Sequence, residues 1–416
     1  MKTTLWLIAV LIVGINQAHG SSETVLWNFQ SSGGGPAFPY YNSLSSDASG
    51  NLYGVTSEGG AFESGSVFKM SPDGKGGWTK TVIFSFPNDG STWPIGGLAL
   101  DSAGNLYGVS AEGGKNDTGY VYKLSPNSSG TWSETVIHAF GKCCSKGPDG
   151  IEPFAGVVVD SQGHLYGTTT EGGANGFGTI YELSPTTSGA WTETILHSFA
   201  YLTEGRYPSS PLLLDAAGNL YGTAAQGGII NYACYVGCGS VFKVVHSGST
   251  WTLDVLHLFN GSDGQYPRYS GVVMDKAGNL YGSAEAGGII QGGAYGVGAV
   301  WELAYSAAQN TYNIQVLHDF PMGGIADGVD LLAGVTLDSQ GNIFGTTSEG
   351  GAYDGGIVFE LTKGTNGWTE KILHSFTTGA DGWSPSGSLV LINGNVFGMT
   401  EGGGTQDDGL VFEITP

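Results

Sequence analysis

The stretch Asp101-Ser-Ala-Gly-Asn-Leu-Tyr-Gly-Val-Ser-Ala-Glu-Gly-Gly114 decides the fold, because close copies of it recur along the whole chain. Each copy contains an aromatic residue followed by glycine, and these aromatic residues are spaced at intervals of 53 to 63 residues. A period of this length is typical of repeat architectures, in which stacked units share a core that no unit forms alone. The seven positions are Tyr53, Tyr107, Tyr166, Tyr221, Tyr281, Phe344 and Phe397.

One unit predicts four short strands in sequential antiparallel order. Residues 97–101 and 106–110 flank a Ser-Ala-Gly-Asn turn, as expected of a hairpin. Residues 120–124 form the third strand, and residues 132–140, apolar at alternate positions, form the fourth. Four strands joined by short loops are typical of a propeller blade. The predicted fold class is therefore all-β, a β-propeller.

The two ends of the chain predict how the ring closes. The last unit supplies three strands within residues 388–414 and no fourth. Near the other end, residues 23–29 (Glu-Thr-Val-Leu-Trp-Asn-Phe) match residues 134–140 (Glu-Thr-Val-Ile-His-Ala-Phe), which belong to a fourth strand. Pairing of the N-terminal strand with the last blade would remove the exposed sheet edges that promote aggregation. We expect a single seven-bladed propeller of four-stranded antiparallel blades over residues 21–416.

Residues 1–20 are predicted to be a signal peptide. Lys2 precedes an apolar run over residues 5–15, and the small residues Ala18 and Gly20 follow it, as in secretory leaders. No later segment approaches the roughly 18 apolar residues that a membrane span needs. We therefore expect an exported protein, secreted or periplasmic, that is monomeric and has no membrane span.

The charge balance excludes one class of partner. The chain carries 36 acidic and 14 basic residues, a formal net charge of -22. Nucleic acid is excluded, because binding to phosphates needs a basic surface. An acidic surface keeps an exported protein soluble and attracts cations or basic partners.

Four cysteines lie in loop insertions, at Cys143, Cys144, Cys234 and Cys238. Export favours oxidation, and the even number is compatible with two disulfides. A bond between Cys234 and Cys238 would close one loop. Cys143 and Cys144 would form a strained vicinal bridge, pair with the other two, or stay free.

The variable loops are expected to gather on one face of the ring. They are the loops between strands two and three and the loops between blades. The inter-blade loops repeat an acidic-glycine step followed by proline, as at Asp149-Gly150 with Pro153. Asp-Gly is a favoured turn, whereas exposed rings beside it could stack on sugars or anchor a protein. The predicted ligand-binding residues are Trp93, Asp149, Arg206, Tyr207, Tyr266, Arg268 and Trp383.

Arg206 and Arg268 are the two arginines of the chain, and they lie in consecutive inter-blade loops. They could share a groove and bind one carboxylate, or be solvated loop charges. The other loop family begins with Glu58, Glu112, Glu171 and Glu349. Together with loop carbonyls these four glutamates could form a Ca²⁺ site, although no EF-hand spacing is present. No other metal or cofactor is expected.

The histidines predict packing and not catalysis. Five of them occupy one position of the fourth strand, where two other units carry Phe84 and Trp27. A position that accepts His, Phe or Trp is filled by a flat ring, so we expect no histidine triad or metal cluster. The five are His138, His197, His257, His318 and His374.

The repeat resembles the GloVer tandem-repeat family of exported bacterial proteins. The resemblance rests on Asp-Gly-x-x-Pro, Gly-Asn-Leu-Tyr-Gly-x-Thr-x-x-Gly-Gly, Val-Phe-Glu/Lys-Leu and Trp-x-Glu-Thr-Val-Leu-His-x-Phe, and it covers residues 22–416. It implies the propeller architecture and supplies no catalytic residues. The Gly-Gly pair followed by an aromatic residue and then Trp is similar to kelch propellers, which implies the same layout.

Two functions are compatible with these patterns. The first is a secreted binding or scaffold propeller whose loop face engages a polysaccharide or an extracellular protein. The second is a carbohydrate-active lyase or hydrolase that uses the same face. The near symmetry of the repeat and the lack of a compact acid-base set favour the first, although a fold alone does not define a function.

Overall fold

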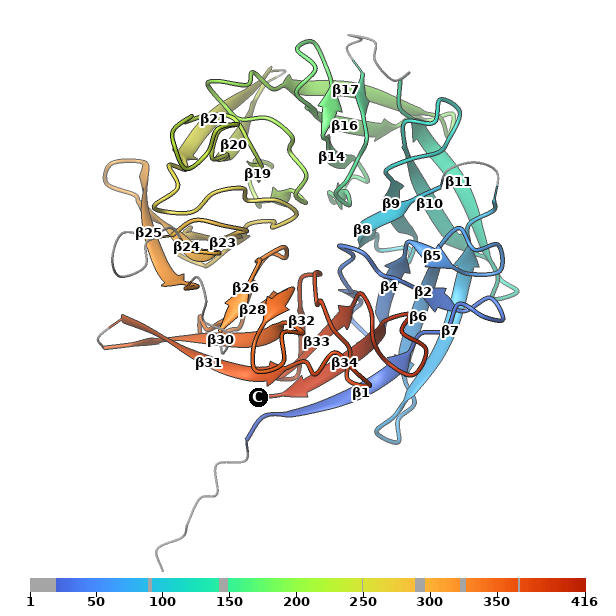
Figure 1. Ribbon diagram of the computed structural model, residues 1–416. Helices are drawn as coiled ribbons and strands as arrows, with labels where there is room; N and C mark the ends of the chain where they lie inside the picture. The colour runs from blue at the N-terminus through green and yellow to red at the C-terminus, as the bar shows by residue number, and fades with distance from the viewer. Residues whose placement is uncertain are drawn as a thin grey trace, which may run out of the picture.

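The computed structural model describes residues 20–88, 92–141, 149–248, 250–288, 296–321, 327–365 and 367–416. These residues form seven four-stranded antiparallel sheets, numbered here as blades 1 to 7, and three two-stranded sheets. The predicted signal peptide falls outside the described ranges except for its last residue, Gly20. The seven sheets stand side by side in a ring, with the fourth strand of each on the outer rim (Figure 1).

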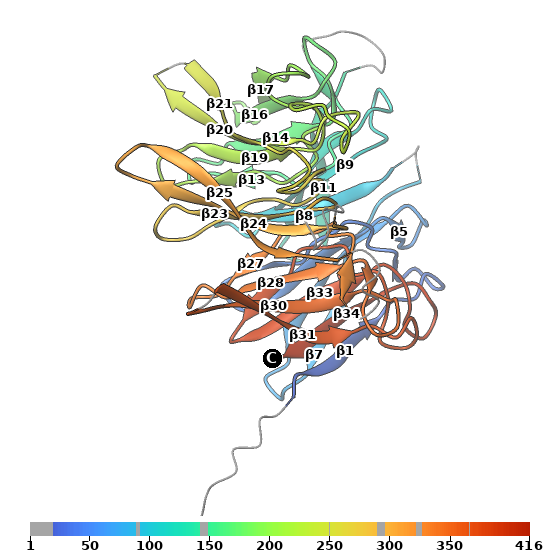
Figure 2. The same ribbon diagram turned by 60° about the vertical axis from the view of Figure 1, so that its left-hand side comes forward.

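The strands of the blades have the following bounds. Blade 1 contains β3 (Ser45–Ser46), β4 (Leu52–Thr56), β6 (Ser66–Pro72) and β7 (Trp78–Ser85); blade 2 contains β8 (Pro94–Leu100), β9 (Leu106–Ser110), β10 (Tyr120–Pro126) and β11 (Trp132–Ala139). Blade 3 contains β13 (Val158–Val159), β14 (Leu165–Thr169), β16 (Thr179–Pro185) and β17 (Trp191–Ser198); blade 4 contains β18 (Leu213–Leu214), β19 (Leu220–Ala224), β20 (Ser240–Ser247) and β21 (Thr250–Leu258). Blade 5 contains β22 (Val273–Met274), β23 (Leu280–Ala284), β24 (Ala299–Ser306) and β25 (Thr311–Asp319); blade 6 contains β27 (Thr336–Leu337), β28 (Ile343–Thr347), β30 (Ile357–Gly364) and β31 (Gly367–Ser375). Blade 7 contains β32 (Val390–Ile392), β33 (Asn395–Thr400), β34 (Leu410–Thr415) and β1 (Ser22–Asn28). Figure 2 shows blades 4 to 6 one beside another.

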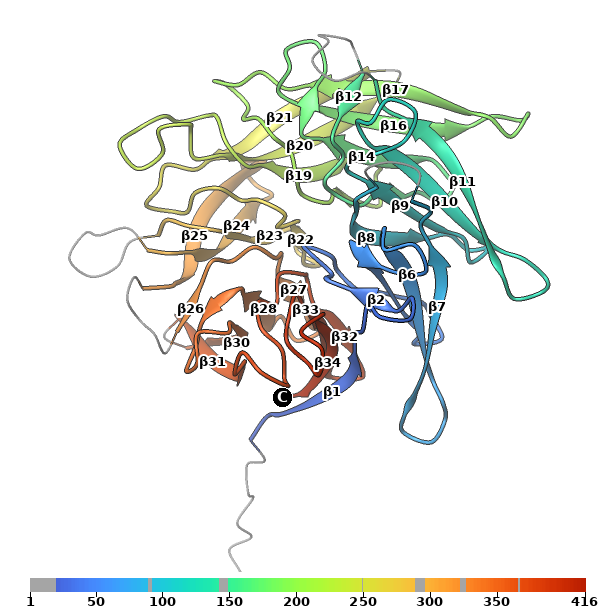
Figure 3. The ribbon, with the colours of Figure 1, turned by 45° about the vertical axis from the view of Figure 1, so that its right-hand side comes forward.

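Ring closure follows the prediction. In blade 7 the N-terminal β1 pairs antiparallel with the C-terminal β34, from Ser22 opposite Thr415 to Asn28 opposite Leu410. Figure 3 shows β1 against β34, with the chain then running through β2 into blade 1. A strand from each end of the chain therefore completes one sheet, and the predictions of seven blades and of terminal pairing are confirmed.

The repeated sequence motif is a hydrogen-bonded turn. In blade 2, Oδ1 of Asp101 accepts the N–H groups of Ala103 and Asn105, each at 2.9 Å. Its Oδ2 accepts the Asn105 amide at 2.7 Å and the Tyr107 hydroxyl at 2.9 Å. Burial alone would raise the pKa of Asp101, but these hydrogen bonds outweigh burial and hold the pKa below its ordinary value. The spacing Asp-x-x-Gly-Asn-x-Tyr thus joins β8 to β9.

The core is divided into seven apolar layers, one between each pair of neighbouring blades. In each layer a phenylalanine after the fourth strand packs against an aromatic residue on the third strand of the next blade. Phe140 and Tyr181, for example, are both fully buried with ring centroids 5.2 Å apart. A chain of this length exceeds what one core supports, and stacked layers resolve that limit. The seven phenylalanines are Phe29, Phe86, Phe140, Phe199, Phe259, Phe320 and Phe376.

The two variable loop families meet on one face, as predicted. Three short antiparallel pairs join an inter-blade loop to the loop after the second strand: β2 (Pro36–Ala37) with β5 (Glu58–Gly59), β12 (Gly150–Ile151) with β15 (Glu171–Gly172), and β26 (Gly328–Val329) with β29 (Glu349–Gly350). Single bridges replace them elsewhere, as between Arg206 and Gln226. We call this surface the loop face.

Candidate functional site

Four aromatic rings from different blades meet near the axis of the ring. Trp93 packs edge to face on Phe154, with ring centroids 5.5 Å apart, and Phe154 lies 6.3 Å from Tyr269. Tyr269 stacks on Tyr41 at 4.4 Å. Tyr41 precedes blade 1 and Tyr269 precedes blade 5. Because blades 1 and 5 are not neighbours, the contact between Tyr41 and Tyr269 crosses the centre of the ring.

Charged groups surround this aromatic stack. Nε of Arg268 lies 3.2 Å from Oε2 of Glu285, and Glu401 accepts a hydrogen bond from the Ser384 hydroxyl at 3.2 Å. Burial, followed by the nearby Glu401, raises the pKa of Tyr41 to about 12. Burial also raises the pKa of Glu285 in spite of Arg268.

The position of Glu285 and Glu401 explains a departure in the repeat. Both occur one residue earlier than the glutamate of the other units. A shift of one residue on an extended chain turns a side chain to the opposite side. Glu285 therefore takes the position that the buried Ser57 has in the first unit. The glutamate of that first unit, Glu58, is exposed. This shift directs two carboxylates toward the axis.

A hollow of about 230 Å³ opens on the loop face beside the stack. Its wall combines the rings of Tyr207 and Tyr269 with Arg268 and two carboxylates, Glu152 and Glu171. Glu152 and Tyr207 have φ values of 57° and 56°, in the left-handed region that residues other than glycine seldom adopt. The equivalent loop residues of four other units share this conformation, namely Phe38, Tyr266, Asp330 and Ser384. Burial, followed by the charge of Glu171, raises the pKa of Glu152. The remaining lining residues are Phe154, Thr170, Ser209, Ala225 and Gln226.

Four of the predicted ligand-binding residues gather at this hollow. Tyr207 and Arg268 line it, and Arg268 lies over the ring of Tyr266 at 5.2 Å. Arg206 lies over the Tyr207 ring at 4.6 Å and donates to Oε1 of Gln226 from Nε and Nη2 at 3.2 and 2.8 Å. The two arginines have separate partners within the protein, Gln226 for Arg206 and Glu285 for Arg268. That they share one bound carboxylate stays a prediction. Gln226, which replaces glutamate in its unit, is explained as the acceptor for Arg206.

The other predicted aromatic residues are placed differently. Trp93 belongs to the central stack. Trp383 lies in blade 7, where its Nε1 donates to Asp407 at 3.0 Å and its ring covers Gly402. Neither tryptophan lines the hollow. The loop face therefore holds Trp383 apart from the site that Tyr207 and Arg268 form.

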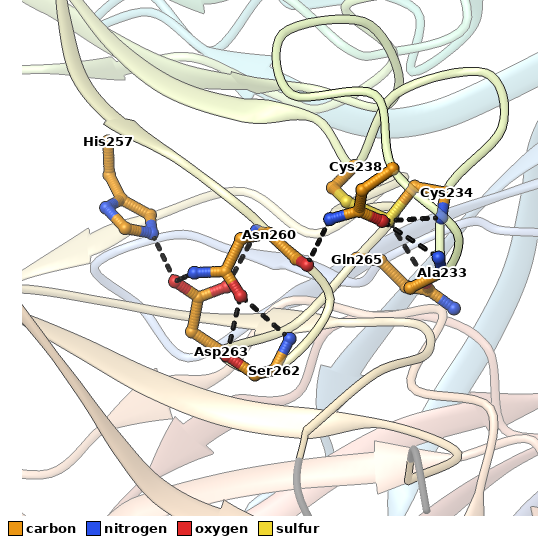
Figure 4. The surroundings of a disulfide bond; sticks show 9 residues. Ala233, Cys234, Cys238, His257, Asn260, Ser262, Asp263 and Gln265 are labelled. Carbon is orange, nitrogen blue, oxygen red and sulfur yellow. Dashed lines mark hydrogen bonds and ion pairs between the residues drawn. A yellow bond between two sulfur atoms is a disulfide. The ribbon is translucent and has the colours of Figure 1, made fainter.

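Asp149 lies at the rim of the ring, against a histidine. Its Oδ1 is 3.5 Å from Nε2 of His138, and the same type of contact joins His197 to Glu204 at 2.8 Å and His257 to Asp263 at 2.9 Å. Figure 4 shows the His257 ring directed at Asp263. The rings do pack, as predicted, and the same histidines also pair with acids, a contact that the sequence did not predict. His318–Asp327 and His374–Asp381 complete the set.

A β-bulge before each histidine directs its ring. In blade 2 the pairing shifts between Val121 opposite His138 and Tyr122 opposite Val136, which leaves Ile137 as the extra residue. Bulges re-aim side chains in this way. The pattern that could have revealed these pairs is that every unit with the strand-four histidine also has an acidic-glycine step six to eleven residues later.

The four glutamates of the predicted calcium site lie in four different blades. Their carbonyl groups accept hydroxyl hydrogen bonds within each loop, as Glu58 does from Thr56 at 3.0 Å. Within the described ranges, the groups of three possible metal ligands that converge do not include Glu58, Glu112, Glu171 or Glu349. The converging groups are His138, Asp149 and Glu193, and His318, Asp327 and Glu370.

The disulfide between Cys234 and Cys238 is present, with Cα atoms 5.1 Å apart. It closes the loop between β19 and β20 of blade 4, beside the Asp263 turn (Figure 4). Both cysteines are fully buried. The prediction of this pair is confirmed, whereas Cys143 and Cys144 lie outside the described residues.

Larger hollows occur at the sides of the blades away from the loop face. One of about 520 Å³ lies between blades 4 and 5 and is lined by Tyr221, Tyr305 and Tyr312. Another, of about 450 Å³, lies between blades 3 and 4 beside Trp251. Because such grooves recur between successive blades, we attribute them to blade packing. The hollow on the loop face depends on residues that break the repeat.

We expect the protein to be less stable at about pH 8 than at about pH 5, in part because of Glu23 on β1. Burial, followed by the charge of Asp381, raises the pKa of Glu23 from 4.5 to about 7. A folded-state pKa above the unfolded one contributes stability that is complete below pH 4.5 and lost as the pH rises through 7. The melting temperature of Glu23→Gln should therefore fall less between these two pH values. An equal fall in variant and wild type would contradict this prediction.

The chain forms a seven-bladed β-propeller with a hollow beside an aromatic stack on its loop face. The chain belongs to the Gloeobacter/Verrucomicrobia repeat family, whose pattern matches residues 11–148, 135–293 and 289–416. The comparison with curated proteins found no matching sequence. Within the described residues, no helix is long and apolar enough to cross a bilayer.

Several solved structures are similar at low identity. A candidate 6-phosphogluconolactonase of Bacteroides uniformis is 14% identical, with a TM-score of 0.48 over 86% of this chain and 88% of that chain. A gluconolactonase of Xanthomonas campestris is 14% identical, with a TM-score of 0.39 over 78% and 86% of the two chains. A Trypanosoma rangeli sialidase is 12% identical, with a TM-score of 0.42 over 95% and 59%. Likenesses this distant carry no conclusion about activity.

Proposed function

We propose that the protein is an exported binding propeller whose loop-face hollow holds one sugar unit of a polysaccharide. The observation that carries the proposal is the lining of the hollow, in which aromatic rings stand next to charged groups. Tyr207 and Tyr269 offer flat apolar faces, which suit the C–H face of a sugar ring. Glu171 and Arg268 supply an acceptor and donors for its hydroxyl groups.

The size of the hollow supports a single sugar unit. Its volume of about 230 Å³ is below the roughly 300–1,000 Å³ of pockets that enclose a drug-sized ligand. A polysaccharide would therefore place one ring in the hollow and lie across the loop face. Export is supported by the predicted signal peptide and by the disulfide between Cys234 and Cys238.

Binding to an array of plant and microbial glycans tests this function. For a glycan that binds, Tyr207→Ala is expected to weaken the affinity about tenfold or more, because central aromatic contacts carry much of the binding energy. Tyr353→Ala is the control, since this tyrosine is 61% exposed and does not line the hollow. Affinities are measured by isothermal titration calorimetry.

Two other results would contradict the proposal. The first is an array without binding, combined with capture of a defined extracellular protein that Tyr207→Ala abolishes, which would assign the hollow to a protein partner. The second is glycan binding that Tyr207→Ala and Tyr353→Ala leave equally unchanged, which would place the glycan elsewhere.

One observation favours an enzyme as the second candidate. Glu152 and Glu171 line the same hollow, and burial raises the pKa of Glu152 above its ordinary value. Glycoside hydrolysis uses two carboxylates, one of them a general acid with a raised pKa. Assays for new reducing ends and for unsaturated products on the bound glycan test this alternative. Turnover that Glu152→Gln abolishes while binding persists would replace the binding function with a catalytic one.

A further inference from the structure

The rim of the ring contains two clusters with the same three kinds of side chain. In each, a histidine of one blade and the acid of the following turn meet a glutamate from the fourth strand of the next blade. The possible ligand atoms of each cluster lie within 4.8 Å of one another. The clusters are His138, Asp149 and Glu193 between blades 2 and 3, and His318, Asp327 and Glu370 between blades 5 and 6.

The facing atoms are buried and have no hydrogen-bond partners. In the first cluster this holds for Nε2 of His138, Oδ1 of Asp149 and Oε1 of Glu193. In the second cluster it holds for Nε2 of His318. Oε1 of Glu370 is also buried without a partner, whereas Oε2 of Glu370 is the oxygen that lies 3.7 Å from Nε2 of His318. Unpaired buried polar atoms cost free energy, and two carboxylates that face each other repel. A cation between the three side chains would satisfy all of them.

The distances between histidine and acid in these clusters are longer than ordinary hydrogen bonds. Nε2 of His138 lies 3.5 Å from both Asp149 and Glu193, and Nε2 of His318 lies 3.7 Å from both of its acids. Hydrogen bonds of this type span about 2.7–3.2 Å. Around a tetrahedral zinc ion with bonds of about 2.0–2.2 Å, neighbouring ligand atoms lie about 3.3–3.6 Å apart. The two histidine–acid distances of the first cluster match this spacing, and those of the second are slightly wider.

The same chain supplies two comparison sites without the third ligand. The fourth-strand position that Glu193 occupies in blade 3 is occupied by Leu253 in blade 4 and by Ile314 in blade 5. At these interfaces the pairs His197–Glu204 and His257–Asp263 are ordinary hydrogen bonds of 2.8 and 2.9 Å. The wider spacing therefore accompanies the additional glutamate.

The interface between blades 6 and 7 also has a glutamate at this position, but its histidine and aspartate are hydrogen bonded to each other. Glu23 occupies the equivalent place in blade 7, near Asp381 of blade 6, and its Oε1 is also buried without a hydrogen-bond partner. Nε2 of His374 lies 3.2 Å from Asp381, and the three do not form a converging group among the described residues. We count it as a hydrogen-bonded pair, so the expected number of sites is two.

We propose that each of the two clusters binds one divalent transition-metal ion of the zinc class, which joins neighbouring blades at the rim. Imidazole and carboxylate together suit zinc better than calcium, which takes oxygen ligands. Two carboxylates also balance the charge of a divalent ion. Three protein ligands leave a fourth position for water. Because the ion would bind the folded protein and not the unfolded chain, it would raise the melting temperature.

Calorimetric titration of the chelator-treated protein with zinc chloride tests the proposal. Wild type is expected to bind two ions per chain. Glu193→Leu and Glu370→Leu are each expected to bind one ion, and the double variant none. Leucine is a suitable replacement because Leu253 already occupies the equivalent place in blade 4. Thr194→Leu is the matched control, since Thr194 is an exposed neighbour on the same strand, and it should bind two.

The melting temperature provides a second readout. Zinc should raise the melting temperature of wild type and of Thr194→Leu, and it should leave that of the double variant unchanged. Circular dichroism confirms that each variant is folded. The proposal is overturned if wild type binds no zinc, or if the folded double variant still binds two ions, because the ions would then lie elsewhere.

Discussion

Removal of residues 21–30 is expected to abolish the soluble, cooperatively folded protein. Without β1, blade 7 keeps three strands, and β34 presents an unpaired edge over its whole length. The truncation also removes the fully buried Phe29, which packs on Phe68 of blade 1 at 5.4 Å. The lost contacts approach the roughly 5–15 kcal/mol that stabilises a typical native protein, and an open sheet edge promotes aggregation. Size-exclusion chromatography and near-ultraviolet circular dichroism measure the outcome.

A chain that begins at Ser21 is the control, and it should be monomeric and folded. A synthetic peptide of residues 21–30, added during refolding, should restore part of the soluble truncated protein, because a separate strand can pair with an open sheet edge. If the truncated chain were monomeric with an unchanged melting temperature, closure by the terminal strands would not be what stabilises the ring.

Gly108→Ala is expected to lower the free energy of unfolding by about 3 kcal/mol, the upper part of the range for an overfilled core. Gly108 lies on β9 directly opposite Tyr122 of β10. A Cβ atom at position 108 would lie 2.3 Å from the Tyr122 hydroxyl oxygen and 2.5 Å from the adjacent ring carbon. Tyr122 is fully buried and packs on Phe86 of blade 1, so its ring cannot move aside cheaply. Urea denaturation measures the loss.

Gly97→Ala in the same blade is the control for this prediction. A Cβ atom at position 97 would meet its nearest neighbour at 3.8 Å, an ordinary contact. We expect a change in the free energy of unfolding within about 0.5 kcal/mol, as for substitutions away from special features. Equal effects of the two substitutions would show that the space above Gly108 is not what the core requires.

The glycine effect should hold in every blade, because the arrangement is repeated. In each unit the aromatic residue of the third strand covers the glycine of the second, and it then packs on the phenylalanine of the preceding blade. Trp301, for example, covers Gly282, because a Cβ atom added at position 282 would lie 2.3 Å from the Trp301 ring. The ring centroids of Trp301 and Phe259 are 5.6 Å apart. The aromatic-glycine pair that marks the repeat in the sequence is thus a packing device between blades.

The rim clusters and the loop-face hollow use different parts of the repeat. The hollow is made by inter-blade loops that depart from the common pattern, at Tyr207 and Arg268. The clusters depend on a third ligand that only some blades supply, as the contrast between Glu193 and Leu253 illustrates. Zinc binding and glycan binding are therefore expected to be separable by mutation.

Much of the fold could be predicted because its information is local and repeated. The period of Tyr107 and its equivalents predicted the blades, and the match of residues 23–29 to residues 134–140 predicted the closing strand. The turn at Asp101 is contained within seven residues. The sequence also predicts two residues of the hollow, Tyr207 as a ring beside the acidic-glycine step and Arg268 as one of the two arginines of the chain.

The sequence by itself determined the number of blades, their strand order and the face on which the loops gather, because paired strands of a blade follow one another in the chain, except for β1 and β34 in blade 7. Only the tertiary structure decided which side chains meet across blades. His138 meets Glu193, 55 residues away, and Tyr41 stacks on Tyr269 across the axis. Such contacts depend on how far each blade is rotated and offset against the next, a property of the packed ring that no single repeat encodes.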